Sequence, residues 1–224
     1  MNSDIQHEMK STEKQNDNIN VFLCSSRYVF TPSLSDNTLT YSEACISFVT
    51  EHGFFAAIGH NSDNKLSYLR TEIYSYNKVS DALVQAGQVL CSTSTGVYGA
   101  FYDDYSPTVF AKVQIASLDS ININSEAELW MPVKNSSPQS FRGKIVAVFP
   151  DKPYPVLFNV EDDNFPGATF GCSGSVILQN EKLVAVMAGA NDNPAILLYC
   201  TSAEQMITDL EKMLWDIANN NSAE

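Results

Sequence analysis

The residues of this 224-residue chain best suited to covalent chemistry are Gly171-Cys172-Ser173-Gly174-Ser175. A serine hydroxyl is a weak nucleophile, and it needs a neighbouring base and donors directed at the developing oxyanion. Glycines on both sides let the backbone turn sharply, so that the N–H groups of Gly171 and Ser173 can form an oxyanion hole. An ordinary Gly/Ser turn has the same composition. Ser173 is therefore a candidate nucleophile that requires a partner elsewhere in the chain.

The base for such a serine is a histidine, and the chain contains three. His7 lies in a polar N-terminal segment, and His52 lies in the turn-like sequence TEHGF. His60 ends the apolar run GFFAAIGH and precedes the polar stretch NSDN. A strand end is a rigid support for a general base, although a structural histidine also fits there. We expect His60 to act on Ser173.

The elements that must position these two residues are predominantly β-strands. Short runs rich in Val, Ile, Phe and Tyr alternate with turn signals, which is typical of antiparallel barrels and sandwiches. About ten to twelve strands suit two six-stranded barrels better than one open sheet with long edges. The expected strands lie within residues 21–30, 44–50, 54–60, 96–102, 108–117, 127–133, 144–150, 155–160, 175–179, 183–189 and 195–200.

The two ends of the chain differ from this pattern. Residues 1–19 are polar and poor in apolar side chains, which predicts a disordered tail. Residues 202–220 carry apolar side chains at three- and four-residue spacing, and Ser202 followed by Gln205 fits a capping box. This pattern predicts a C-terminal amphipathic helix that packs on the preceding barrel.

Composition excludes several classes of function. The net charge is −13 and basic residues form no cluster, which argues against a nucleic-acid partner. Five cysteines without a close pair argue against a disulfide framework or a zinc site. No signal peptide or membrane span is visible, so a soluble, cytoplasmic or otherwise intracellular protein is expected. We expect neither a metal nor an organic cofactor.

Four segments in order resemble the sporulation-type serine peptidases typified by stage IV sporulation protein B. ISFVTEHGFFAAIGHNSD is similar to the segment of that family that contains its histidine, and FGCSGSVILQNEKLVAV is similar to the segment that contains its serine. STSTGVYGAF and AELWMPVKNSSPQSFRGKIVAVF resemble the segments between them. The resemblance covers roughly residues 43–200. Family members typically carry a membrane anchor and a PDZ module that this sequence does not show, so a role in sporulation is not inferred.

The resemblance implies an all-β, chymotrypsin-like double barrel. Residues 20–118 would form the barrel with His60 and residues 119–201 the barrel with Ser173, followed by the helix. For the third catalytic group, the resemblance implies Asp162, at the end of the strand before the serine. Asp163 is a close substitute. Asp103 and Asp104 are further candidates, because general chymotrypsin-like enzymes carry their aspartate at about that chain distance after the histidine. Each could equally be a solvated turn carboxylate.

The predicted function is therefore a serine endopeptidase that cleaves a protein substrate, with this chain itself among the candidates. His60 would take the Ser173 proton and later donate it to the leaving amine. Ala188, Gly189 and Ala190 would offer a strand edge on which the substrate backbone pairs. A second interpretation is a catalytically inactive relative that binds peptides or a partner. The sequence predicts no oligomeric state.

Overall fold

The computed structural model describes residues 19–24, 27–31, 42–58, 71–77, 82–94, 96–132, 138–168, 171–191 and 196–220. Within these residues, fourteen strands form one continuous sheet that is antiparallel apart from one parallel pair, and a helix follows the last strand. The strands are β1 (Asn20–Cys24), β2 (Arg27–Thr31), β3 (Ser42–Val49), β4 (Phe54–Ala57), β5 (Glu72–Asn77), β6 (Ala82–Ser92), β7 (Val97–Phe101), β8 (Val109–Ile115), β9 (Glu126–Met131), β10 (Gln139–Val148), β11 (Val156–Val160), β12 (Val176–Gln179), β13 (Lys182–Asn191) and β14 (Leu197–Ser202).

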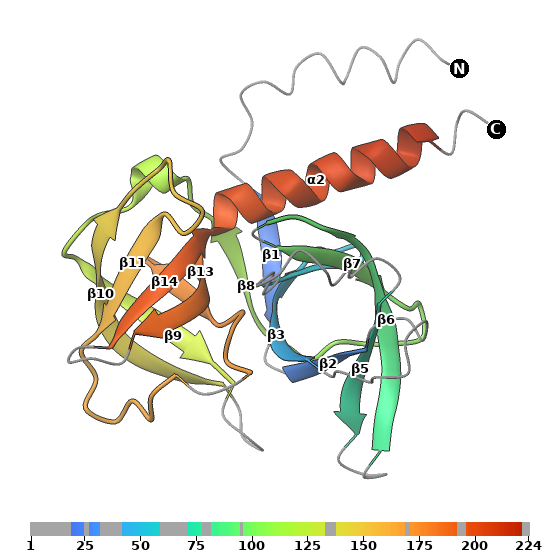
Figure 1. Ribbon diagram of the computed structural model, residues 1–224, viewed down its shortest axis with the longest axis horizontal. Helices are drawn as coiled ribbons and strands as arrows, with labels where there is room; N and C mark the ends of the chain where they lie inside the picture. Colours follow the sequence, from blue (N-terminus) through green and yellow to red (C-terminus); the bar gives the residue numbers. More distant parts are fainter. Residues whose placement is uncertain are drawn as a thin grey trace.

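Strand pairing closes this sheet on itself twice. The first ring runs β3-β2-β5-β6-β7-β4 and returns to β3. The second ring runs β12-β9-β10-β11-β14-β13 and returns to β12. The two barrels lie side by side in Figure 1. Closure removes the long unprotected edges that one open sheet would have, so the expected all-β double barrel is confirmed.

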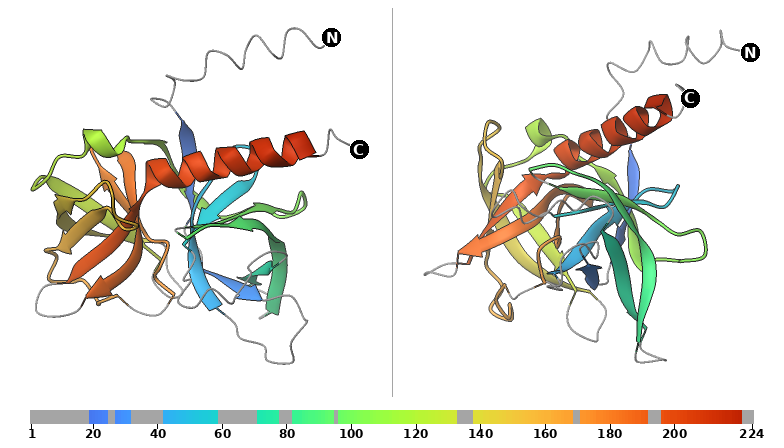
Figure 2. Two further views of the ribbon diagram at one scale, coloured as in Figure 1. Left: turned by 45° about the horizontal axis from the view of Figure 1, so that its top comes forward. Right: turned by 45° about the vertical axis from the view of Figure 1, so that its right-hand side comes forward.

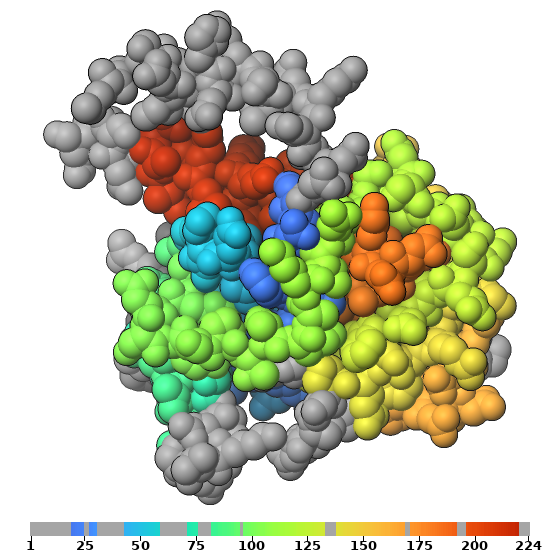
Figure 3. Space-filling view, turned by 180° about the vertical axis from the view of Figure 1, so that it is seen from behind, coloured from blue at the N-terminus to red at the C-terminus, as the bar shows by residue number. Residues whose placement is uncertain are grey.

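The two remaining strands, β1 and β8, join the barrels. β8 pairs with β1 along Val109–Gln114 and with β13 at Gln114 and Ile115, while β1 also pairs with β3. From behind, the yellow-green surface of the β8 region runs between the barrels, beside the blue of β1 (Figure 3). The apolar run at residues 21–30 thus forms two strands with different roles. β1 lies outside the first ring and links it to β8, whereas β2 is a member of that ring.

The sequence pattern missed the hairpin of β5 and β6. These strands pair along their length, from Glu72 with Gln88 to Asn77 with Ala82. Residues 82–85 of β6 are all exposed, so this part of the strand has no buried face. An exposed ribbon requires no apolar alternation, and its sequence therefore gave no strand signal.

Three apolar cores hold the fold together. One fills the first barrel around Tyr28 and Phe55, and one fills the second barrel around Phe158 and Ile177. The third lies between the barrels, where Leu23 of β1 meets side chains of β4, β7, β13 and the C-terminal helix. This third core fixes the seam at which side chains from the two barrels can meet.

The helix α2 (Ala203–Asn220) begins directly after β14 of the second barrel and extends over the first. The rotated views agree on this course (Figure 2). Its N-terminus is capped by Ser202, whose Oγ accepts a hydrogen bond of 3.3 Å from the Gln205 amide. Its buried face consists of apolar side chains at helical spacing that join the third core: Met206, Ile207, Leu210 and Met213. The helix therefore packs on both barrels rather than on the last one alone.

Candidate active site

The loop that carries Ser173 is bound to both barrels. On the side of the first barrel, the Cys45 amide of β3 donates to the Ser173 carbonyl at 2.8 Å. On the side of the second barrel, the Gly174 amide donates to the Met187 carbonyl and the Met187 amide donates to the Ser175 carbonyl, both at 2.8 Å. Ser173 is therefore held at the seam by backbone hydrogen bonds in two directions.

The backbone of this loop requires its glycines. Gly171 has φ = 83° and Gly174 has φ = 96°, a region that L side chains rarely adopt. The Cys172 carbonyl accepts from the Ser175 amide at 3.0 Å and from the Ser175 hydroxyl at 2.6 Å. Because a trans peptide directs its C=O and the next N–H to opposite sides, the Ser173 N–H points away from Ser175. Such an orientation is suited to an oxyanion donor.

The Ser173 hydroxyl lies beside β13. Its Oγ donates to the Ala188 carbonyl at 3.4 Å, and the residue is partly exposed. Between Gly189 and Asn191, the pairing of β13 within the described residues is with β14 alone. A Cβ placed on Gly189 would meet nothing within 4 Å. The edge from Ala188 onward therefore has room beside it, at the position proposed for a substrate strand.

Three residues of β2 and β3 also surround the loop, and no sequence pattern indicated them. The Cys45 thiol donates to the Gly171 carbonyl at 3.1 Å, and burial raises the pKa of this thiol above its usual range. Arg27 Nη2 donates to Cys172 Sγ at 3.6 Å. A Cβ placed on Gly171 would stand 3.4 Å from Glu43 Oε2 and 3.6 Å from Arg27 Cδ. Pairing of β2 with β3 brings these side chains together.

Two of the three histidines, His60 and His7, lie outside the described residues. His52, which the structure does describe, lies in the exposed turn between β3 and β4, with Nε2 at 3.7 Å from Glu51 Oε1. The last described residue before His60 is Ile58, which is buried in the third core, between the two barrels. The chain therefore lies between the barrels where it leaves β4.

Asp103 and Asp104 lie at the other end of β4. In the antiparallel pair of β4 with β7, Ala57 faces Val97 and Phe54 faces Ala100. The chain leaving β4 toward His60 therefore departs beside the start of β7. Asp103 and Asp104 follow the end of β7, in an exposed turn. The four residues of β4, about 13 Å at 3.3 Å per residue, separate the two places.

Asp162 lies just beyond the end of β11, in the second barrel. Its carboxylate accepts hydrogen bonds from the Asn164 amide at 3.0 Å, the Asn164 side chain at 3.3 Å and the Arg142 amide at 3.3 Å. The backbone hydrogen bonds from Asn164 and Arg142 lower the pKa of this carboxyl. Asp163 is exposed in the same turn. The hydrogen bonds recorded for Asp162 all stay within the second barrel.

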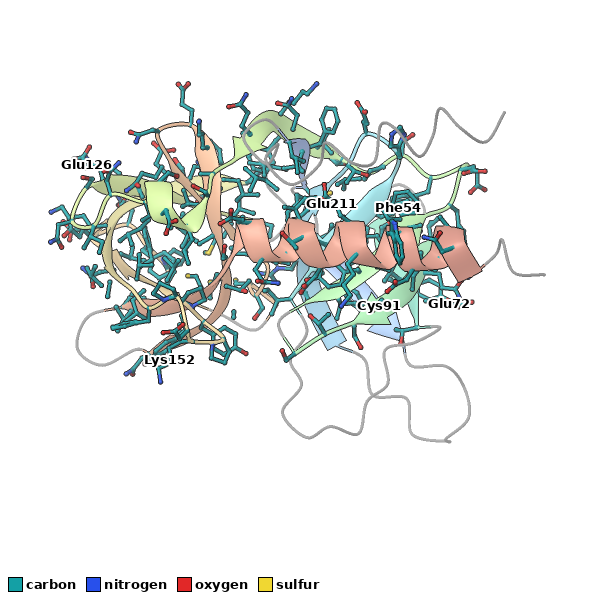
Figure 4. All side chains as sticks on the ribbon, turned by 90° about the horizontal axis from the view of Figure 1, so that it is seen from above. Phe54, Glu72, Cys91, Glu126, Lys152 and Glu211 are labelled. Carbon is teal, nitrogen blue, oxygen red and sulfur yellow. The ribbon has the colours of Figure 1, made fainter. Side chains whose placement is uncertain are left out.

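A different carboxylate lies near the start of β7. Asp209 of α2 accepts a hydrogen bond of 3.1 Å from the buried hydroxyl of Tyr98 and one of 3.4 Å from Thr93. Its other oxygen accepts from the Gln205 side chain at 2.8 Å. In Figure 4, Cys91 of the adjoining β6 is labelled close beside the helix. Asp209 thus joins the helix of the second barrel to the first barrel.

Removing the Tyr98 hydroxyl is expected to weaken this joint. Tyr98→Phe deprives a carboxylate of a buried donor, which should lower the free energy of unfolding by about 1.5–3 kcal/mol. Urea unfolding measures the change. Tyr199→Phe, which removes an exposed hydroxyl, is the control and should change stability by less than about 0.5 kcal/mol. Equal effects of the two substitutions would show that the hydrogen bond to Asp209 contributes nothing.

The described part of the chain holds no group of three or more His, Cys, Asp or Glu side chains placed to bind a metal ion. None of its helices combines the length and the apolar character needed to cross a bilayer.

The sequence matches one known family. The profile of the SpoIVB peptidase S55 family matches residues 75–207, which is more than half of the chain. No curated protein matches the sequence.

Solved structures of proteases share the fold at low sequence identity. The HtrA-type protease AlgW, solved with a tripeptide, superposes with a TM-score of 0.56 and 10% identity, over 85% of this chain and 60% of its own. The serine endoprotease from Yersinia pestis superposes with a TM-score of 0.55 and 13% identity, over 87% of this chain and 64% of its own. The MamO protease domain from Magnetospirillum magneticum superposes with a TM-score of 0.51 and 10% identity, over 84% of this chain and 97% of its own. The chain thus spans about three fifths of the length of AlgW. At these identities the likeness shows the fold.

Proposed function

Because the chain belongs to the SpoIVB peptidase S55 family, we propose that it is a serine endopeptidase that uses Ser173 and His60 to cleave a peptide bond of a protein substrate. The observation that carries this proposal is the position of Ser173 at the seam, bound to β3 on one side and to β13 on the other. A loop held from both barrels keeps the nucleophile in place relative to groups on the first barrel.

In the proposed reaction, His60 takes the Ser173 proton as the hydroxyl attacks a substrate carbonyl. The tetrahedral oxyanion is stabilised by the N–H groups of Gly171 and Ser173. His60 then protonates the leaving amine, and water hydrolyses the acyl-enzyme by the same steps. The orientation of the Ser173 N–H and the left-handed Gly171 support this assignment. The substrate backbone pairs with the edge at Ala188, Gly189 and Ala190.

The fluorophosphonate reaction tests the nucleophile directly, because this reagent phosphonylates an activated serine. Wild-type protein should be labelled on Ser173, and Ser173→Ala should not be labelled. Peptide mapping by mass spectrometry identifies the site. Ser140→Ala is the matched control and should be labelled like wild-type protein, because it removes an exposed serine hydroxyl of β10. Folded wild-type protein without label would favour the second interpretation, a relative that binds peptides without cleaving them.

Self-cleavage is a further part of the proposal. Intact-mass measurement during incubation should show shortened wild-type chains, whereas Ser173→Ala should keep its full mass. Shortening of Ser173→Ala at the same rate would assign the cleavage to another protease.

Asp162 is proposed as the third group because of the family resemblance. Its loss should then lower kcat by on the order of 10⁴-fold, the effect of losing the aspartate that orients a catalytic histidine. The comparison variants are Asp163→Asn, Asp103→Asn, Asp104→Asn and Asp209→Asn. The hydrogen bonds of Asp162 within its own turn give an alternative outcome, in which Asp162→Asn keeps full activity and loses only stability. That result would remove Asp162 from the mechanism and leave the pair of Ser173 and His60 intact.

A further inference from the structure

Two charged side chains of the first barrel lie close to Gly171, the glycine assigned to the oxyanion hole. Glu43 of β3 brings Oε2 within 3.4 Å, and Cβ within 3.5 Å, of the position that a Gly171 Cβ would occupy. Arg27 of β2 brings Cδ within 3.6 Å of the same point. The loop that carries Ser173 therefore adjoins a carboxylate and the side chain of an arginine, both from the first barrel.

A bound ligand would not meet these two charged groups equally. The Arg27 guanidinium is directed at the loop that carries Ser173: its Nη2 donates to Cys172 Sγ at 3.6 Å, and its Nε is buried. Glu43 is exposed. The salt bridges within the described residues join Glu51 with His52 and Lys144 with Glu161, so Glu43 has no cationic partner among them. Among the described residues, the exposed charged group beside Gly171 is therefore the Glu43 carboxylate, while Arg27 is partly buried.

The path of a substrate leads past this carboxylate. Ser173 lies between β13, whose Ala188 carbonyl it contacts, and β3, whose Cys45 amide binds the Ser173 carbonyl. A peptide with one half paired to the edge of β13 must direct its other half across Ser173 onto β3 and β2. Glu43, two residues from Cys45 on β3, is on that side. The residues next to the scissile bond in this second half then lie within reach of Glu43.

A carboxylate at this place also affects the reaction itself. Negative charge develops on the oxyanion beside Gly171, and a neighbouring carboxylate opposes it. A lysine or arginine of the substrate that pairs with Glu43 removes this opposition while it gains an ion pair. The benefit appears in the transition state as well as in binding, so it raises kcat/KM. The net charge of −13 additionally attracts cationic substrates.

We propose that Glu43 is a specificity-determining residue, which selects substrates with lysine or arginine next to the scissile bond in the half that crosses onto the first barrel. This inference rests on the proposed function, because it requires Ser173 as the nucleophile.

The test uses short synthetic peptides that carry Lys, Gln or Glu at each position in turn, with cleavage sites read by mass spectrometry. In wild-type protein, kcat/KM should be roughly two- to fivefold higher with Lys than with Gln at one or two positions on one side of the cleaved bond, the effect of one exposed ion pair. Glu43→Gln should bring this ratio close to one, and Glu43→Lys should favour Glu at the same positions. The Lys preference should also fall as salt is added.

Glu126→Gln is the matched control, because it removes the same charge from an exposed position at the outer end of the second barrel, labelled in Figure 4. It should leave the ratio unchanged. A Lys preference that survives Glu43→Gln, or that Glu126→Gln reduces equally, would overturn the inference. Fluorophosphonate labelling of Ser173 in every variant separates the two proposals: labelled protein without a Glu43-dependent preference refutes only this inference, while unlabelled wild-type protein refutes both.

Protection gives a second measurement that needs no turnover. Lys-containing peptides should slow the labelling of wild-type Ser173 more than Gln-containing peptides do, and Glu43→Gln should abolish the difference. Equal protection in wild-type protein would count against the role of Glu43.

Discussion

Removing the imidazole of His60 and the hydroxyl of Ser173 together is expected to lower activity no further than removing either group alone. A nucleophile and its base act as one unit, so each single substitution already abolishes the shared step. His60→Ala and Ser173→Ala should each reduce kcat by on the order of 10⁴- to 10⁶-fold, and the double variant should retain the same residual rate. A double-mutant cycle on one cleaved peptide measures this coupling.

The control for this cycle is another histidine of the chain. His52 is exposed in the turn before β4, where it faces Glu51. His52→Ala should leave kcat unchanged. The double variant Ser173→Ala/His52→Ala should have the same residual kcat as Ser173→Ala. Additive losses from His60→Ala and Ser173→Ala would mean that the two residues act independently, and the proposed mechanism would fail.

Gly174→Ala should have the largest effect on stability. Gly174 has φ = 96°, and a Cβ at this position would stand 2.1 Å from the Cys45 carbonyl oxygen and 2.9 Å from its carbon. Because those atoms belong to the backbone of β3, no side-chain rotation relieves the overlap. The left-handed conformation of alanine costs roughly 1–2 kcal/mol, and overpacking adds typically 1–3 kcal/mol. We expect the free energy of unfolding to fall by about 2–5 kcal/mol.

Gly167 separates the two contributions. It has φ = 87°, and a Cβ there would meet nothing within 4 Å. Gly167→Ala should therefore show the conformational cost alone, about 1–2 kcal/mol in urea unfolding. Gly174→Ala should also slow fluorophosphonate labelling, because relief of the overlap moves the Ser173 loop away from β3. Equal losses of stability in the two variants would show that contact with β3 does not constrain the loop.

Local sequence determined the nature of the elements and the candidate chemistry. Apolar spacing from Met206 to Met213 predicted α2, because a buried helical face has a short-range period that any stretch of chain displays by itself. The repeated β-branched and aromatic runs predicted strands for the same reason, and their number favoured two barrels because one open sheet would have long unprotected edges. The glycines beside Ser173 predicted a sharp turn, and the structure shows left-handed backbone at Gly171 and Gly174. The pairing of Ser173 with His60 stays a prediction.

Tertiary structure decided which side chains surround Ser173. Pairing of β2 with β3, and packing of β3 against the loop, bring Arg27, Glu43 and Cys45 to residues more than a hundred positions away. The antiparallel pair of β4 with β7 likewise puts Asp103 and Asp104 at the end of β4 opposite to the exit toward His60. These neighbours depend on strand order and register, which follow from closing two rings and packing them on a common helix. Such long-range contacts leave no periodic mark in the chain, so the composition of the seam became visible only in the folded protein.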